Sequence, residues 1–118
     1  MYKKILVFAL MILALVNFQP LGAIYTDDPV QRGDELTMFV NLENELNYKL
    51  KDVRVKALIY DLGEVVNSND FDMPRGDTSR TRLTWDVPQD IEPGEYVVRV
   101  TASNDKFRKT RHIIVDVV

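Results

Sequence analysis

Residues 93–117, PGEYVVRVTASNDKFRKTRHIIVDV, contain two runs of alternating apolar residues joined by a short polar turn. Proline fixes φ and glycine is permissive, so Pro93-Gly94 predicts a turn that leads into the first run. The apolar positions of the two runs are Tyr96, Val98, Val100 and Ala102, then Ile113, Val115 and Val117. Alternation with period two is typical of a half-buried strand, so the stretch predicts an antiparallel hairpin.

The same alternation occurs in three upstream segments. Their apolar positions are Leu36, Met38, Val40 and Leu42, then Val53, Val55, Ala57 and Ile59, then Leu83, Trp85 and Val87. Asp61-Leu62-Gly63 predicts a turn followed by a short strand at residues 64–66, and the polar residues 67–77 predict a loop. No segment keeps helical periodicity over three turns. The sequence therefore predicts an all-β fold, an antiparallel β-sandwich of six to seven strands.

The N-terminus has the layout of a secretory signal. Lys3 and Lys4 precede an apolar run over residues 5–16, and a polar break at residues 17–20 leads to the small pair Gly22-Ala23. We predict a signal peptide, or a hydrophobic helix retained as an uncleaved anchor, over residues 1–23, and one domain over residues 24–118. A spanning helix needs about 20 apolar residues, which favours cleavage. The expected localisation is secreted or cell surface.

The charge balance argues against nucleic acid as a partner. The chain has 15 basic and 18 acidic side chains. Removal of the leader takes away two lysines, so the formal charge of the remainder is 13 minus 18, or −5. An acidic domain repels the phosphate backbone. A membrane partner is expected only through the N-terminal segment, if that segment is not cleaved.

The domain must be stabilised by packing alone, because the chain has no cysteine and cannot form a disulfide. Trp85 is the single tryptophan. Its place in an alternating run predicts burial between the two sheets, with the indole N–H paired to an acceptor.

No catalytic residue and no cofactor are predicted. His112 is the only histidine and accompanies no nucleophile in a recognisable motif, so we interpret it as a surface residue of a strand. Asp70 and Asp72 could offer oxygen ligands to calcium, or could cap turns in a solvated loop. Their spacing lacks the glycine and distal glutamate of a full calcium loop. Arg75-Gly76-Asp77 spells an integrin-ligand tripeptide but also has ordinary turn composition.

Four segments carry a resemblance to a known family. They are Gly33-Asp34-Glu35-Leu36, Asp52-Val53-Arg54-Val55, Leu83-Thr84-Trp85-Asp86-Val87-Pro88 and Pro93-Gly94-Glu95-Tyr96-Val97-Val98-Arg99-Val100. With these segments the chain resembles the immunoglobulin-like domains of prokaryotic surface proteins, most closely the cell-adhesion-related domains of bacteria and archaea. The resemblance implies an immunoglobulin-like β-sandwich used as a spacer, adhesion or protein-interaction module, and it carries over no catalytic residue.

Three strands that lie side by side in such sandwiches suggest a face for a partner. We call it the partner face, and its predicted residues are Arg54, Lys56, Leu58, Tyr60, Val97, Arg99 and Ile114. Antiparallel pairing predicts two halves: Leu58, Tyr60, Val97 and Ile114 form the apolar one, while the basic residues gather at the other end with Arg108 and His112. Single exposed apolar residues are normal on a protein surface, but four large ones on one exposed sheet form a patch that indicates a contact site.

The sequence therefore predicts an exported, non-enzymatic module for protein interaction or adhesion at the cell surface, with a protein or an envelope polymer as partner. One alternative is a subunit of a surface filament or envelope assembly, which oligomerises by edge-strand pairing. Another is an accessory carbohydrate-binding domain. Its aromatic platform would come from the aromatic residues outside the core pattern, which are Phe39, Tyr48, Tyr60 and Phe71.

Overall fold

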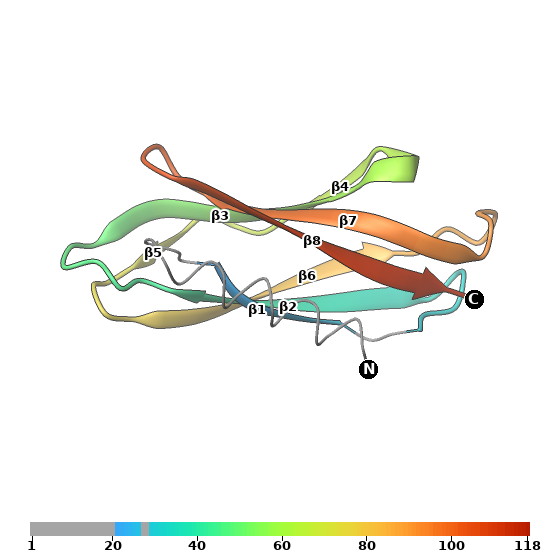
Figure 1. Cartoon of the computed structure of the whole chain (residues 1–118), viewed down its shortest axis with the longest axis horizontal. Helices are drawn as coiled ribbons and strands as arrows, with labels where there is room; N and C mark the ends of the chain where they lie inside the picture. Colours follow the sequence, from blue (N-terminus) through green and yellow to red (C-terminus); the bar gives the residue numbers. More distant parts are fainter. Residues whose placement is uncertain (1–20, 27–28) are drawn as a thin grey trace.

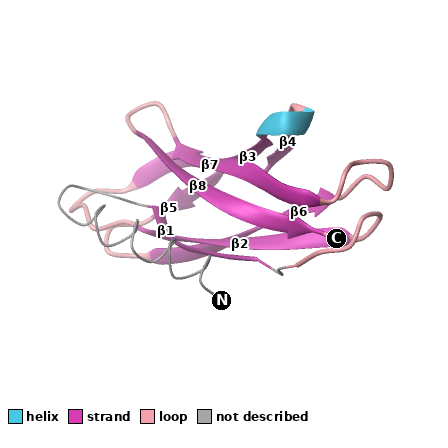
Figure 2. Ribbon diagram, turned by 45° about the vertical axis from the view of Figure 1, so that its right-hand side comes forward, coloured by secondary structure: helices cyan, strands magenta, loops and turns pink. Residues whose placement is uncertain are grey.

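The computed structural model describes residues 21–26 and 29–118, which form two antiparallel sheets that pack face to face (Figure 1). The three-stranded sheet has the order β1-β2-β6, with β1 (Leu21–Thr26), β2 (Glu35–Glu43) and β6 (Thr78–Asp86). The five-stranded sheet has the order β4-β3-β7-β8, with β4 (Glu64–Asn67), β3 (Leu50–Ile59), β7 (Gly94–Ser103) and β8 (Arg108–Val117), and β5 (Phe71–Met73) also pairs with β3. The helix η1 (Tyr60–Leu62) joins β3 to β4 (Figure 2).

The core lies between the two sheets and contains the residues predicted from the alternation, together with Ile24, Val30, Leu50 and Met73. Every apolar position assigned inward on the five longest strands is buried. Trp85 is only 2% exposed, its ring meets that of Tyr96 edge-on at 6.5 Å, and its Nε1 donates a hydrogen bond to the Glu64 carboxylate at 2.8 Å. The predicted all-β sandwich and the predicted place of Trp85 are therefore confirmed.

Two strands were not predicted. The segment 67–77, expected to be a loop, contains β5, in which Met73 is fully buried and pairs with Leu50 of β3. That expectation was wrong because three residues are too few to show a period, although apolar Phe71 and Met73 stand two positions apart. The other unpredicted strand is β1, which pairs with β2.

The chain crosses from one sheet to the other near its N-terminus. After β1, Val30 bridges Val117 of β8 in parallel, with hydrogen bonds of 2.9 Å to the Asp116 carbonyl and 2.8 Å from the Val118 amide. Residues 21–23, placed by the signal-peptide prediction before the cut, form the first half of β1. The rest of that segment, including the predicted helix, lies outside the described residues. Within the described ranges, no helix has the length and apolarity to cross a membrane.

Three polar side chains are buried beside this core: Asn44, Thr101 and Arg111. Arg111 faces inward from β8, opposite Val100, and burial lowers the pKa of its guanidinium. Since β8 is an edge strand, an inward-pointing charge there discourages pairing with the edge of another molecule.

Candidate functional site

The predicted partner face is the outer surface of the five-stranded sheet. The register pairs Leu58 with Arg99, Arg99 with His112, and Val97 with Ile114, so these side chains lie on one surface across β3, β7 and β8. Tyr60 follows directly after β3 as the first residue of η1. The structure therefore brings together the residues that sequence alternation assigned outward.

An apolar patch occupies one half of this face. We define it by Leu58, Tyr60, Val65, Val97 and Ile114. Tyr60 is 43% exposed, Val65 47% and Val97 41%. Val65 was not among the predicted residues; it belongs to β4 and pairs with Leu58. The patch thus extends over four neighbouring strands and is one strand wider than the sequence indicated.

Tyr60 is held in place by two side chains from neighbouring strands. Its ring stacks on that of His112 with centroids 5.8 Å apart and planes at 10°, and its hydroxyl lies 3.1 Å from Nε2 of His112. The Arg99 guanidinium lies 5.5 Å from the centre of the Tyr60 ring, in cation–π range. The predicted separation into apolar and basic halves is therefore wrong for Arg99 and His112, because the register places Arg99 between Leu58 and His112, at the apolar half of the face.

The basic end of the face is partly neutralised. Nη2 of Arg54 lies 3.2 Å from a carboxylate oxygen of Asp70, and both side chains are about half exposed. Lys56 lies opposite Thr101, whose hydroxyl is 3.3 Å from that of Thr110. Arg54 therefore contributes less net positive charge to this end than the sequence suggested.

Asp70 and Asp72 both face protein cations. Asp70 pairs with Arg54, and Asp72 lies 3.4 Å from the ammonium of Lys49. The other oxygen of Asp72 accepts a hydrogen bond of 3.0 Å from the amide of Asp52, which has a positive φ of 55°. Among the described residues no three His, Cys, Asp or Glu side chains gather as a metal group. Asp72 lies in β5 and accepts from an amide of β3, so it supports the irregular pairing of these two strands and not a turn of a solvated loop, as the turn-capping interpretation had it.

The carboxylate of Asp72 should make the stability of the fold depend on pH in the acid range. The Asp52 amide, followed by Lys49, lowers the pKa of Asp72 below its ordinary 3.8. A lowered folded-state pKa stabilises the fold above the unfolded value, and the contribution is lost as pH falls through the folded value. We expect Asp72→Asn to lower the melting temperature slightly at neutral pH, and the difference from the native chain to vanish in acid. A difference independent of pH, in thermal unfolding from about pH 6 to about pH 2, would contradict this.

The tripeptide Arg75-Gly76-Asp77 is exposed in the turn between β5 and β6. Gly76 has φ 71°, and its amide donates to the backbone carbonyl of Asn44, whose own amide donates to the Asp77 carbonyl. The turn is thus tied by its backbone to the loop that precedes β3. This arrangement satisfies ordinary turn requirements and needs no ligand to explain it.

Comparison with solved structures identifies the fold. The solution structure of the CARDB domain of PF1109 from Pyrococcus furiosus matches with a TM-score of 0.66 and 17% identity, over 86% of this chain and 97% of that one. The crystal structure of the same domain, in complex with di-metal ions, gives 0.64 and 16% identity, over 80% and 84%. The chain has the fold of a CARDB domain.

The CARDB fold confirms the resemblance to cell-adhesion-related domains, the family for which the fold is named. The C-terminal domain of wzt is also similar, with a TM-score of 0.60 and 16% identity, over 85% of this chain and 73% of that one. The sequence matches no protein-family model and no curated protein. These likenesses describe the fold, which also occurs in domains of enzymes.

Proposed function

We propose that this chain is an exported, non-enzymatic module that binds a protein at the cell surface through its partner face. The observation that carries the proposal is the apolar patch. An exposed sheet with three apolar side chains each more than 40% exposed, and two more beside them, is the kind of surface that marks a protein contact. Export is supported by the N-terminal sequence, in which two lysines are followed by an apolar run over residues 5–16 and then by a polar break at residues 17–20.

The composition of the patch fits an interface. Tyrosine and arginine are enriched among residues that contribute most to binding. Here Tyr60 is already ordered by His112 and Arg99, so less side-chain entropy is lost when a partner covers it. Lys56 and Arg108 stand toward the other end of the face and would attract an acidic partner.

The face is a better candidate for this contact than the β8 edge. The C-terminal part of β8 is covered by Val30 and by Arg32, whose amide donates to the Val118 carbonyl at 3.1 Å. Arg111 points inward from the same strand. Both features act against pairing of β8 with another chain, which the filament alternative would require at this edge.

The double substitution Tyr60→Glu with Val97→Glu tests the proposal. We expect at least a tenfold loss of binding of the labelled full chain to intact cells and envelope preparations of the source organism, because two charges would be buried in an apolar contact. The melting temperature should change little, since both side chains face outward. Arg82→Glu is the matched control: it makes the net charge more negative by the same two units, at an exposed position of β6 in the other sheet, and binding should persist.

The dependence of binding on salt concentration provides a second measurement. If basic residues steer an acidic partner, binding weakens as the Debye length falls from about 10 Å at 0.1 M to about 3 Å at 1 M salt. Unfolding of the double variant would show that these residues belong to the core and that the register is shifted by one. Undiminished binding of a folded double variant would exclude the partner face as the contact.

A further inference from the structure

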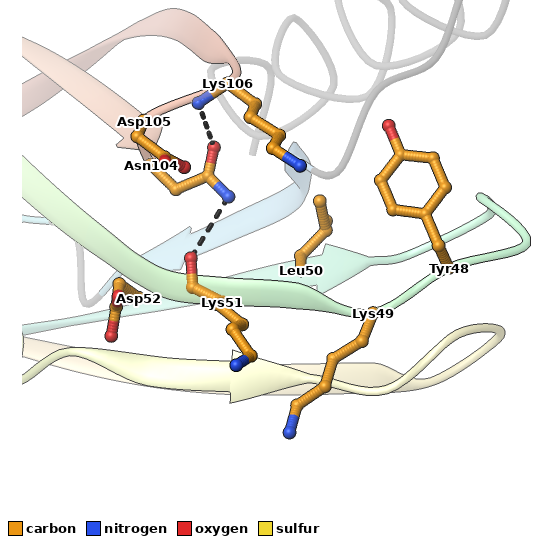
Figure 3. A pocket seen from close by; sticks show the side chains of 8 residues that line it. All are labelled: Tyr48, Lys49, Leu50, Lys51, Asp52, Asn104, Asp105 and Lys106. Atoms are coloured by element: carbon orange, nitrogen blue, oxygen red, sulfur yellow. Dashed lines mark hydrogen bonds between the residues drawn. The ribbon is translucent and has the colours of Figure 1, made fainter.

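A pocket of about 570 Å³ opens at one end of the sandwich, between the chain entering β3 and the hairpin that joins β7 to β8 (Figure 3). Its lining includes one aromatic and five polar residues: Tyr48, Lys51, Asp52, Asn104, Asp105 and Lys106. The volume falls within the range of about 300–1,000 Å³ that small-molecule sites occupy. Loops at one end of a sandwich are also where antibody variable domains bind, which supports this location by analogy.

Two asparagines hold the walls of the pocket. The Asn104 amide donates to the Lys51 carbonyl at 3.1 Å, and its oxygen accepts from the amides of Lys106 and Phe107 at 2.8 and 3.0 Å. Figure 3 shows the bond from Asn104 to Lys51 bridging the two walls, while the bond with Lys106 lies within the hairpin. On the other side, the fully buried Asn44 donates to the Tyr48 carbonyl at 3.0 Å. The shape of the pocket is therefore held by the chain's own hydrogen bonds.

The charges in the pocket are balanced. Lys51, Asp52, Asp105 and Lys106 line the pocket. Figure 3 shows Lys106 directed toward Tyr48, whereas the Lys51 and Asp52 side chains point away from the hairpin, and a third lysine, Lys49, pairs with Asp72 at the rim. Equal numbers of ammonium and carboxylate groups give little net field, so neither a strong anion nor a strong cation is favoured. On the hairpin side of the pocket, Lys106 supplies hydrogen-bond donors and Asp105 supplies acceptors.

Tyr48 adds an aromatic surface to these polar groups. Tyr48 is 47% exposed, and the ammonium of Lys106 lies 5.8 Å from the centre of its ring. An exposed ring offers an apolar platform beside the polar groups. A sugar ring has the matching chemistry: hydroxyls that donate and accept hydrogen bonds around its rim, and an apolar C–H face that packs on an aromatic ring.

We propose that this pocket binds a neutral saccharide unit of a polysaccharide, with Tyr48 as the stacking platform and the Lys106 and Asp105 side chains as partners for hydroxyl groups. The site is at the loop end of the sandwich and uses no residue of the partner face. The saccharide proposal can therefore be tested independently of the protein contact proposed above.

The test uses the isotopically labelled full chain, in a sugar-free detergent, titrated with hexasaccharides of glucose, xylose and N-acetylglucosamine, and with hexagalacturonate as an acidic probe. We expect at least one neutral probe to shift the amide signals of Tyr48, Lys51 and Lys106. Tyr48→Ala should weaken that binding at least tenfold, whereas Tyr48→Phe should retain most of it because the ring remains. Tyr60→Ala, at the exposed tyrosine of the partner face, is the matched control and should bind like the native chain.

Three results would overturn the proposal. One is the absence of shifts at the pocket with every neutral probe. Another is unchanged affinity in a folded Tyr48→Ala variant, which would exclude stacking on this ring. The last is preferred binding of hexagalacturonate with a steep salt dependence, which would make the pocket an anion site.

Discussion

Replacing Trp85 with alanine is expected to lower the free energy of unfolding by about 3–5 kcal/mol, the usual cost of removing a large aromatic side chain from a core. Trp85 is 2% exposed and packs edge-on against Tyr96 between the sheets. Because domains of this size are stable by only about 5–15 kcal/mol, the variant should unfold at a much lower denaturant concentration. Chemical denaturation followed by far-UV circular dichroism measures the change, since the variant has no tryptophan to report.

Two controls separate packing from hydrogen bonding at this position. Trp85→Phe keeps most of the apolar area but loses the N–H that donates to Glu64. Because Glu64 is exposed, water can replace that partner, and we expect a clearly smaller loss than with alanine. A loss of less than about 1 kcal/mol for Trp85→Ala would mean that the core does not depend on this side chain.

Alternation predicted the long strands well for a physical reason. When one face of a strand is buried, a slip of one residue would expose its whole apolar set, so the register is encoded in the sequence. Val53, Val55 and Ala57 show this, since all three are fully buried as expected. The same logic assigned Tyr60 and Val97 to the outer surface, where both side chains are more than 40% exposed.

Features that depend on contacts between distant segments could not be read from the sequence. The pocket joins Lys51 to Asn104 across 53 positions, and no local pattern signals that approach. Val65 joins the apolar patch only because β4, four residues long, folds back on β3. Arg111 occupies an inward position of a strand whose other buried residues are apolar, so alternation alone could not show that an arginine is buried there.

Asn44 is the most informative of the residues that sequence reasoning missed. It lies in the polar stretch 43–51, where composition predicts exposure, yet it is fully buried. Its amide nitrogen donates to the carbonyls of Tyr48, Met73 and Pro74 at 3.0, 3.0 and 3.2 Å, and its oxygen accepts from the Leu46 amide at 3.1 Å. One side chain thus joins the loop before β3 to the end of β5.

We therefore expect Asn44→Ala to cost about 3 kcal/mol in the free energy of unfolding, because each buried polar group left without a partner costs about 1–3 kcal/mol. The loss should appear in equilibrium denaturation, with faster hydrogen exchange at the Leu46 and Gly76 amides. Asn44→Asp tests the direction of the bonds. A carboxylate there would face three carbonyl oxygens without a donor, so this variant should be at least as unstable as the alanine variant.

Asn47→Ala is the matched control, since Asn47 lies in the same loop with its side chain exposed. It should change the free energy of unfolding by no more than about 0.5 kcal/mol. Full stability of Asn44→Asp would show that the donated hydrogen bonds do not hold this end of the sandwich. If Asn44→Ala is destabilised as expected, the saccharide pocket should weaken with it, because Tyr48 would lose the bond that fixes its backbone. The partner face, on the outer surface of the five-stranded sheet, should then keep its affinity at temperatures where the variant is folded.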